Sequence, residues 1–233
     1  MKLGIIGAMR IEVETLKENI VDLQTTEYAG LTFYEGFLEG TPVVVVVCGV
    51  GKVNAAMCVQ TLIDRFAVTH IVNTGVAGSL CADLDIGDFV ISADAMYHDF
   101  DCHSLSNLYP VGQVPGLSVH AFPADAMLVE KAYAAAQQVN AGHARVGRVA
   151  SGDQFICDKQ VKEKIISNTG AICTEMEGAA IAHAAWRNGI PFVVIRAISD
   201  KADDSAEMDY PTFEAIAAKR CAAVTQLMAK ELN

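Results

Sequence analysis

Short β-branched and apolar runs alternate along the chain with longer amphipathic segments. The runs are apolar at nearly every position and predict strands over residues 3–7, 42–48, 69–75, 89–93, 145–151 and 191–199. The segments between them have helical spacing and predict helices over residues 9–19, 52–66, 124–140, 159–167, 177–188 and 211–232. Strands that are apolar on both faces and separated by helices predict an α/β fold, with a central mixed or largely parallel β-sheet flanked by helices on both sides.

Residues 97–123 form the longest stretch without a clear period, and Gly112, Pro115 and Gly116 interrupt it. A loop of that length inside a compact domain usually covers a site or a partner subunit. No linker, repeat or low-complexity tract divides the 233 residues. The chain is therefore predicted to form a single domain over residues 1–233.

The composition fits a globular protein, with 52% hydrophobic and 19% charged residues. The formal net charge of -11 and the lack of any run of Lys or Arg disfavour nucleic acid and anionic membranes as partners. The apolar opening at residues 3–7 is too short for a signal sequence, and the longest apolar run, residues 42–51, has only the length of a strand. We therefore expect no export signal and no membrane span, and a small neutral molecule as the ligand.

Seven cysteines are scattered through apolar segments, an odd number without a Cys-x-x-Cys pair. Disulfide frameworks use even numbers at regular spacing, and zinc sites use paired cysteines. Buried reduced thiols are the expectation, and they indicate a cytoplasmic protein.

Small residues follow the predicted strands. In open α/β sheets, ligands bind outside the carboxyl ends of the strands, and small residues there let a ligand approach the backbone. The segments selected in this way are Gly7-Ala8-Met9, Gly49-Val50-Gly51, Gly75-Val76-Ala77-Gly78, Ser151-Gly152-Asp153 and Ser199-Asp200.

Carboxylates stand at three places along this predicted edge. Asp200 ends the last apolar run, where apolar neighbours can raise a carboxyl pKa toward the range of a general acid, although Asp200 can equally cap a following turn. Glu12 lies in the first turn of one helix, and Glu175 and Glu177 lie at the start of another. Glu12 can equally be a solvated first-turn glutamate, and Glu175 and Glu177 can be ordinary complements of the helix dipole. Together they predict acid and base groups from three elements at one rim.

Other familiar chemistry is not supported by the spacing. Residues 98–103 hold metal-ligand types, but so densely that a strand would send them to opposite faces. The turn at residues 75–78 lacks the dinucleotide fingerprint, and Gly49, Gly51 and Lys52 lack the first Gly and the Ser or Thr of a phosphate loop. The sequence contains no Gly-x-Ser-x-Gly elbow and no catalytic-cysteine context. The spacing therefore supports no metal site, no dinucleotide fingerprint and no phosphate loop.

Six motifs occur in a consistent order along the chain. They are Gly4-Ile5-Ile6-Gly7-Ala8-Met9 with Glu12, Gly49-Val50-Gly51-Lys52-Val53-Asn54-Ala55-Ala56, Asn73-Thr74-Gly75-Val76-Ala77-Gly78, Ser151-Gly152-Asp153, Glu175-Met176-Glu177 and Arg196-Ala197-Ile198-Ser199-Asp200. Together they closely resemble the bacterial 5'-methylthioadenosine/S-adenosylhomocysteine nucleosidases of the purine nucleoside phosphorylase/uridine phosphorylase superfamily. The match runs nearly end to end, and six motifs in register are far more specific than any one of them.

The resemblance implies a nucleoside-phosphorylase-like three-layer fold and a homodimer, with no metal and no organic cofactor. It implies hydrolysis of the N-glycosidic bond of 5'-methylthioadenosine and S-adenosylhomocysteine, and of 5'-deoxyadenosine. The products are adenine and the 5'-thio-ribose, in methionine salvage and the recycling of S-adenosylmethionine by-products. The loop at residues 98–116 is then expected to reach the partner's 5' pocket.

The resemblance also implies residue roles. Glu12 resembles the base that orients the attacking water, Glu177 the carboxylate that binds the ribose hydroxyls, and Asp200 the acid that protonates N7 of adenine. The other implied substrate contacts are Met176 beside Glu177, Ser199 beside Asp200, Phe155 and Ile156 at the adenine, Met9, Val50 and Tyr210 around the 5' group, and Ala8, Ala77, Gly78 and Arg196 in support.

Two rival functions remain open at this point. A phosphorylase of the same superfamily needs forked Arg donors for its phosphate dianion, and this chain has Asn73 where related phosphorylases have Arg. A nucleoside-binding or storage protein would keep the fold without catalysis, but the three carboxylates argue against it. Adenine release, tested with and without phosphate, separates these possibilities.

Four positions depart from the usual family pattern. Val76 stands where Ser is common, Val50 where Ile is common, Tyr210 where Phe is common, and Arg10 where an acidic residue often follows Met9. The loop at residues 98–116 is also longer than usual. None of these positions carries a chemical step, but they leave the preferred 5' group open among methylthio, homocysteinyl, deoxy and aminodeoxyfutalosine-type substituents.

Overall fold

The computed structural model describes residues 1–106, 108–203 and 205–233. Its helices are α1 (Arg10–Glu18), α2 (Lys52–Phe66), α3 (Ala126–Val139), α4 (Lys159–Thr169), α5 (Gly178–Arg187) and α6 (Ala206–Glu231). Its strands are β1 (Leu3–Gly7), β2 (Val21–Tyr28), β3 (Leu31–Leu38), β4 (Thr41–Val47), β5 (His70–Ser79), β6 (Phe89–Tyr97), β7 (Phe122–Pro123), β8 (Ala144–Ser151), β9 (Cys173–Glu175) and β10 (Phe192–Asp200).

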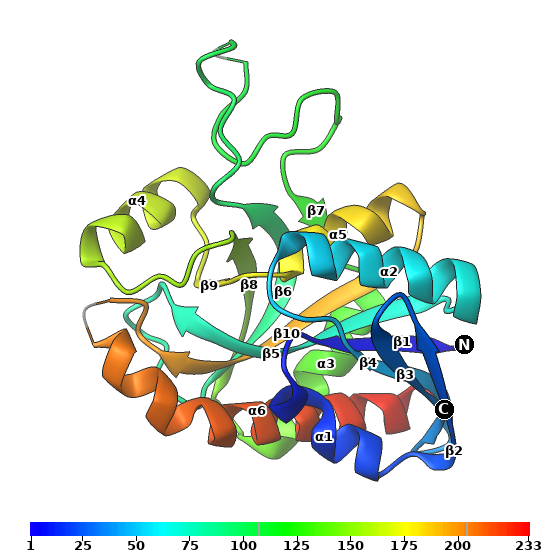
Figure 1. Ribbon diagram of the computed structural model, residues 1–233. Helices are drawn as coiled ribbons and strands as arrows, with labels where there is room; N and C mark the ends of the chain where they lie inside the picture. Colours follow the sequence, from blue (N-terminus) through cyan, green and yellow to red (C-terminus); the bar gives the residue numbers. More distant parts are fainter. Residues whose placement is uncertain (107, 204) are drawn as a thin grey trace.

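Three layers make up the molecule, as the sequence predicts. A twisted sheet lies in the middle, with α2 and α5 over one face and α1, α3 and α6 over the other (Figure 1). The apolar side chains accordingly divide into two large cores, one on each face of the sheet. Leu62 and Ile181 belong to the first core, and Leu16 and Met228 to the second. Helix α4 packs on a smaller cluster around Ile165 at one end of the sheet.

The sheet closes on itself at one end. In the described part of the chain the strand order is β10-β6-β8-β9-β5-β1-β4-β3-β2, with β7 added to β6. Because β10 also pairs with β5, the strands β5, β10, β6, β8 and β9 form a closed ring. Strands β1, β5 and β10 are parallel neighbours, so their carboxyl ends meet at one edge.

Most of the predicted elements are confirmed with small shifts at their ends. β1 and α2 have the predicted bounds, and β6 runs four residues beyond the predicted end, to Tyr97. Helix α6 begins at Ala206 and not at Pro211, because the helix continues through the proline. The prediction took Pro211 for the first helical residue, which is the position that proline favours.

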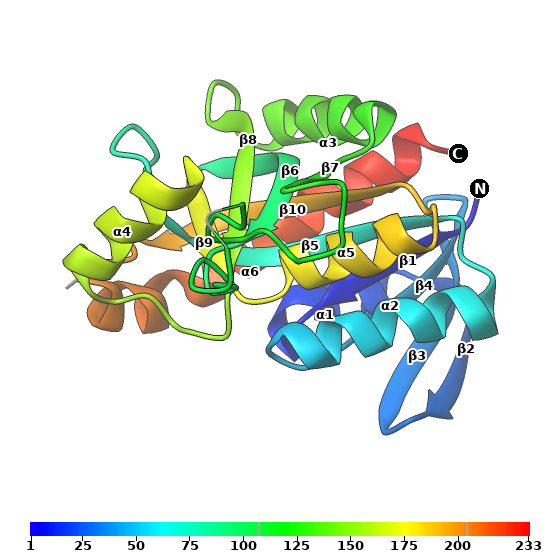
Figure 2. The same ribbon diagram turned by 90° about the horizontal axis from the view of Figure 1, so that it is seen from above.

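Four strands were not predicted: β2, β3, β7 and β9. β2 and β3 form a hairpin that extends from the far end of the sheet (Figure 2). β2 is exposed along its whole length, so it has no buried face to produce an apolar run. β7 and β9 have only two and three residues, too few for a period to be recognised.

The described residues between the end of β6 and the start of β7, 98–106 and 108–121, project from the body beside α2 and α5 (Figure 1). This confirms the long loop expected from the sequence. No helix in the described ranges is both long enough and apolar enough to cross a bilayer. All seven cysteines are free thiols, and Cys48, Cys58, Cys173 and Cys221 are buried.

Candidate active site

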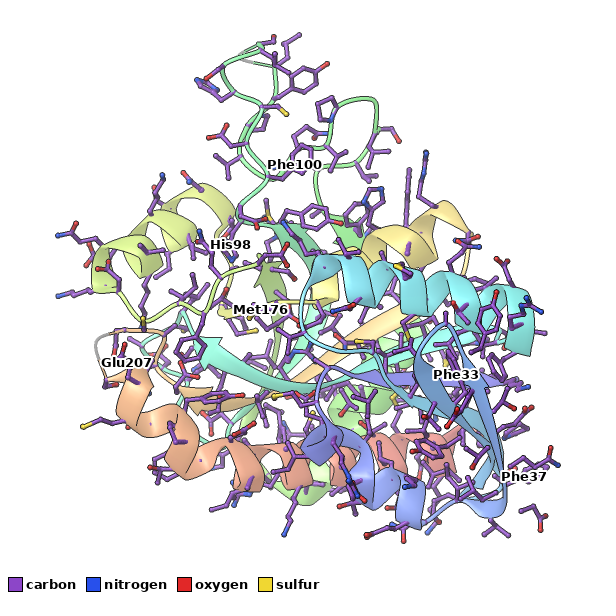
Figure 3. The ribbon with its side chains drawn as sticks, viewed as in Figure 1. Phe33, Phe37, His98, Phe100, Met176 and Glu207 are labelled. Carbon is purple, nitrogen blue, oxygen red and sulfur yellow. The ribbon has the colours of Figure 1, made fainter. Side chains whose placement is uncertain are left out.

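A cavity of about 180 Å³ opens at the edge where β1, β5 and β10 end. Its wall, as far as the structure describes it, includes neither Lys nor Arg. Figure 3 marks Met176 in this region, between α4 and the start of α2. The lining residues are Ala8, Met9, Glu12, Val50, Val76, Ala77, Gly78, Phe155, Thr174, Glu175, Met176, Glu177, Ser199, Asp200 and Tyr210.

Asp200 is the last residue of β10 and is only 2% exposed. Its Oδ1 accepts the N–H of Ala202 at 2.8 Å, and its Oδ2 accepts the Ser199 hydroxyl at 2.9 Å. Asp200 therefore both caps the turn, as the plainer interpretation had it, and lines the cavity. Burial raises the pKa of Asp200 above its ordinary value, against the effect of the two hydrogen bonds. Such a carboxyl can hold a proton and donate it into the cavity.

Gly78 leaves the room that Asp200 needs. A Cβ atom at Gly78 would lie 2.7 Å from Asp200 Oδ1 and 2.8 Å from the Cβ of Ala202. Gly75 plays the same part beside Glu12, because a Cβ there would collide with the Glu12 carboxylate and approach Arg196 Nη1 to 3.0 Å. The small residues along β5 therefore serve close packing against charged side chains.

Glu12 reaches from the first turn of α1 across the end of β1 to β5. Its Oε2 accepts the N–H groups of Ala8 at 2.7 Å and Met9 at 2.9 Å, and its Oε1 accepts the N–H of Val76 at 3.1 Å. Glu12 is 4% exposed, so the interpretation as a solvated first-turn residue is wrong. Burial raises the pKa of Glu12, and the charge of Arg196 and the three N–H donors act in the opposite direction.

Arg196 lies beneath the cavity and is 2% exposed. Its Nη2 donates to Glu175 and, at 2.6 Å, to the Oδ1 of Asn73. The Nδ2 of Asn73 in turn donates to the Ile6 carbonyl at 2.9 Å. Burial works against the charged guanidinium, but the surrounding carboxylates, Glu175 first, raise the pKa of Arg196. Arg196 is therefore a fixed positive charge under the site and not part of its wall.

Glu175 anchors the start of α5. It accepts the N–H groups of Glu177 at 3.1 Å and Gly178 at 2.7 Å, and also the Ser151 hydroxyl. These donors lie at a helix N-terminus, where a negative charge is favoured, so the helix-dipole interpretation is confirmed for Glu175. Burial opposes ionisation, yet Arg196 and these hydrogen bonds hold the pKa of Glu175 below its usual range.

Glu177 accepts the N–H of Gly51 at 2.7 Å, which joins the start of α5 to the loop before α2. Glu177 is 5% exposed. Burial and the neighbouring Glu175 raise the pKa of Glu177 to about 8. Arg196 is already paired with Glu175, so among the described residues of the cavity wall neither Glu12 nor Glu177 has a cation of its own.

The remaining wall is apolar and partly open to solvent. The rings of Phe155 and Tyr210 meet edge to face, with centroids 5.3 Å apart. The Tyr210 hydroxyl lies 3.4 Å from the Met9 sulfur and donates to Glu214 at 3.0 Å. Val50 and Phe155 are about half exposed, so a ligand in the cavity would cover them.

The structure brings nearly all the predicted site residues together. Ile156 lines a small recess next to the main cavity, together with Gly78, Phe155 and Asp200. Arg196 is the exception, because its side chain is buried beneath the cavity and does not line it. Thr174 and Gln154 were missed, since neither belongs to a recognisable pattern. Glu175 was noted only for its motif, and its buried pairing with Arg196 joins residues too distant in sequence for spacing to reveal.

The His- and Asp-rich segment at residues 98–103 does not gather around one point. In the part of the chain that the structure describes, no three His, Cys, Asp or Glu side chains are placed to hold a metal ion. His98 lies at the root of the loop (Figure 3), and its Nε2 is buried without a hydrogen-bond partner among residues 1–106, 108–203 and 205–233.

Comparison with known proteins agrees with this geometry. The model of the phosphorylase superfamily matches residues 2–230. A 5'-methylthioadenosine/S-adenosylhomocysteine nucleosidase from Staphylococcus carnosus is 39% identical over 231 residues, which cover 99% of this chain and 100% of the relative.

Solved structures give the same result. The nucleosidase of the same name from Colwellia psychrerythraea, in complex with adenine, superposes with a TM-score of 0.95 at 40% identity, covering 100% of this chain and 96% of that one. The futalosine hydrolase of Helicobacter pylori superposes with a TM-score of 0.93 at 32% identity, covering 99% and 98% of the two chains. The fold expected from the sequence is thereby confirmed.

Proposed function

This chain belongs to the phosphorylase superfamily, and from that premise we propose that it is an N-glycosidic hydrolase. Its substrates are 5'-methylthioadenosine and S-adenosylhomocysteine, and its products are adenine and a 5'-thio-ribose. Two of the relatives named above are 5'-methylthioadenosine/S-adenosylhomocysteine nucleosidases, and one of these two was solved with bound adenine. Both findings support the assignment. The observation that carries the proposal is the group of three buried carboxyls, Glu12, Glu177 and Asp200, around one cavity.

The proposed chemistry follows the charges that develop as the bond breaks. The purine gains negative charge and the ribose gains positive charge, so an acid at the purine and the carboxylate of Glu12 on the ribose side complement the transition state. Burial raises the pKa of Asp200, which favours its protonated form, and in this proposal Asp200 passes a proton to N7 of the departing adenine. Glu177 accepts hydrogen bonds from the ribose hydroxyls. Glu12, fixed by three backbone N–H groups, orients a water molecule and takes its proton.

Water is a better fit than phosphate as the nucleophile. A phosphate dianion needs Arg or Lys donors, and the described wall of the cavity carries neither. Arg196 is engaged by Glu175 and Asn73 below the wall, and Asn73 occupies the position where phosphorylases have an Arg. Glu12 also presents negative charge on the nucleophile side, which repels an anion.

The experiment that tests this function is adenine release from 5'-methylthioadenosine by the purified protein, with and without added phosphate. Equal rates in both buffers and free 5-methylthioribose as product are the expected results. A strict requirement for phosphate would mean a phosphorylase. Tight binding of 5'-methylthioadenosine without adenine release would mean a binding protein. Comparing kcat/KM for 5'-methylthioadenosine, S-adenosylhomocysteine, 5'-deoxyadenosine and an aminodeoxyfutalosine-type nucleoside then ranks the 5' groups.

We also propose that the protein acts as a homodimer, with the loop at residues 98–116 of each subunit reaching the partner's 5' pocket. Leu105 and Leu108 in this loop are 77% and 82% exposed, and Val53 and Met57 on α2 are 70% and 58% exposed. Apolar side chains so exposed are typical of a surface that a partner covers. Light scattering should give twice the chain mass of 24.8 kDa, and changing Leu105 and Leu108 to Asp should reduce it to the monomer.

The residues 1–233 form one catalytic domain in this proposal, in keeping with a family match over residues 2–230. We propose that the protein is located in the cytoplasm. The four buried free thiols support that location, because reduced cysteines persist in a reducing compartment. Cell fractionation followed by immunoblotting of the fractions tests it.

A further inference from the structure

Lys52 is the charged residue of Gly49-Val50-Gly51-Lys52, the segment that does not match a phosphate loop. The proposed chemistry does not use it. It opens α2 with its side chain 23% exposed. Its Nζ lies 2.6 Å from Asp99 Oδ2 and 3.6 Å from Asp153 Oδ2, and 5.5 Å from the centre of the Tyr97 ring. One ammonium group thus contacts residues from the end of β6, the root of the projecting loop and the segment after β8.

Backbone hydrogen bonds complete the connection. The N–H of Lys52 donates to Asp153 Oδ1 at 2.9 Å, and the N–H of Asp153 donates to Asp99 Oδ2 at 2.9 Å. The preceding N–H, that of Gly51, donates to Glu177 Oε1 at 2.7 Å. The N–H groups of two consecutive residues, Gly51 and Lys52, therefore bind two carboxylates: Glu177, assigned to the ribose, and Asp153, beside the loop. A shift of Asp153 can therefore move Glu177 through this short stretch of backbone.

Apart from Lys52, few groups stabilise the negative charge of Asp99 at the root of the loop. Among the residues that the structure describes, neither Asp99 Oδ1 nor Nε2 of the adjacent His98 has a hydrogen-bond partner, and both atoms are buried. Both side chains lie against Gly152, where an added Cβ would meet them. The N–H of His98 donates to the Ser151 carbonyl at 2.9 Å. Figure 3 shows His98 and Phe100 in succession where the loop leaves the body. Lys52 is the cation that pairs with both Asp99 and Asp153, so without it these two carboxylates would have no compensating cation in the described part of the chain.

We propose that Lys52 is a positioning residue that couples the projecting loop to the ribose carboxylate, Glu177. This inference rests on the proposed function, in which Glu177 binds the ribose hydroxyls. Lys52 does not touch the reacting atoms, so its loss acts on binding and not on the chemical step. Hydrogen bonds to the ribose that persist from ground state to transition state change KM and leave kcat nearly constant.

The test compares Lys52→Met, which keeps the aliphatic stem, with Lys52→Arg, which keeps the charge. The matched control is Lys2→Met, which removes the ion pair of Lys2 with Glu35, at 2.5 Å and with a similarly part-buried Lys, far from the site. Two quantities are measured on the full chain: kcat and KM for adenine release from 5'-methylthioadenosine, and the rate at which chymotrypsin cuts the loop. The loop offers chymotrypsin Phe100, Leu105 and Leu108, whereas the bond after Tyr109 leads into Pro110 and is not cut.

The expected result for Lys52→Met is a KM raised about tenfold with kcat within about twofold of the unmodified protein, since a part-buried ion pair contributes more than an exposed one and less than a fully buried one. Loop cleavage should be faster by a similar factor. Lys52→Arg should restore both quantities, and Lys2→Met should change neither.

A Lys52→Met protein with the KM and cleavage rate of the control overturns the inference, and so does a loss confined to kcat. If Lys52→Met does not fold, Asp99→Asn replaces it, because the amide oxygen can still accept the Asp153 N–H while the charge is gone. Unchanged KM in Asp99→Asn then counts against the coupling. An unmodified protein that releases no adenine would refute the proposed function instead, so the two failures are distinct.

Discussion

Replacing Asp200 by Asn removes the transferable proton from the cavity and changes little else. Asp200 Oδ1 accepts the Ala202 N–H, and the amide oxygen of Asn can do the same. The Ser199 hydroxyl now donates to Oδ2 at 2.9 Å, and it can rotate to accept from the new NH₂ group. With both neighbours satisfied and the side chain 2% exposed, the variant should fold and should still bind adenine.

The expected loss follows from the role of the proton. A positioned general acid contributes roughly two to four powers of ten in rate, or about 3 to 5 kcal/mol of barrier. The side-chain amide of the Asp200→Asn variant can still donate a hydrogen bond to N7, but it cannot give up a proton, so the loss falls on the step in which charge leaves with the purine. We therefore expect Asp200→Asn to lower kcat at least about a hundredfold, with KM within a few-fold of the unmodified protein.

The assay is continuous detection of adenine from saturating 5'-methylthioadenosine, with single-turnover measurements to isolate the chemical step. Asp203→Asn is the control, because Asp203 lies three residues further on and outside the lining of the cavity. kcat/KM of the unmodified protein should fall at high pH, since burial raises the pKa of Asp200 and the acid must be protonated. Near-normal turnover by Asp200→Asn would remove Asp200 from the mechanism.

Three further predictions concern other parts of the site. The pKa of Glu177, about 8 against an ordinary 4.5, means that the native state keeps a proton that the unfolded chain releases, so the free energy of unfolding falls as pH rises from 4.5 to about 8. Glu177→Gln should flatten this slope, by on the order of 1.4 kcal/mol per pH unit, in urea titrations at pH 5 and 8; equal slopes contradict it. Arg196→Met should destabilise the protein by about 3 to 5 kcal/mol in the same assay, because it leaves Glu175 as an unpaired buried charge, and adding Glu175→Gln should recover part of the loss; no recovery would mean that the pair is not coupled. Tyr210→Phe should lower kcat/KM for S-adenosylhomocysteine relative to 5'-methylthioadenosine by about two- to tenfold, the range of one hydrogen bond, and an unchanged ratio would exclude the hydroxyl from 5' recognition.

The three layers of the fold could be predicted because buried strands and helices show a regular spacing of apolar residues. The strand β1 and the helix α2 have the predicted bounds, since apolar runs and helical spacing define both. The hairpin of β2 and β3 could not be found in this way, because β2 is solvent-exposed throughout and its order comes from pairing with β3. Its turn, at Ala29 and Gly30, has positive φ values of 52° and 76°, of which only the Gly is a usual signal.

The candidate active site could likewise be predicted only in part. Before any resemblance was considered, the general rule for sheet edges selected Asp200, and Glu12 stood out as a carboxylate in the first turn of a helix that opens at a strand end. Their burial and partners could not be read from the sequence: the Glu12 carboxylate is held by the N–H of Val76 from a distant strand. The pairing of Arg196 with Glu175 and Asn73 likewise joins three strands whose register is set only in the folded sheet.

The ring of strands also fixes when the site can exist during synthesis. The carboxyls that line the cavity come from residue 12 near the beginning of the chain and residue 200 near its end, and the ring closes only when β10 pairs with β5. Contacts between residues so far apart in sequence form late, because the intervening chain must first be brought together. A chain still emerging from the ribosome has no closed ring and therefore no Asp200 carboxyl beside the cavity. Closure of the ring is then the step that completes the cavity within one subunit.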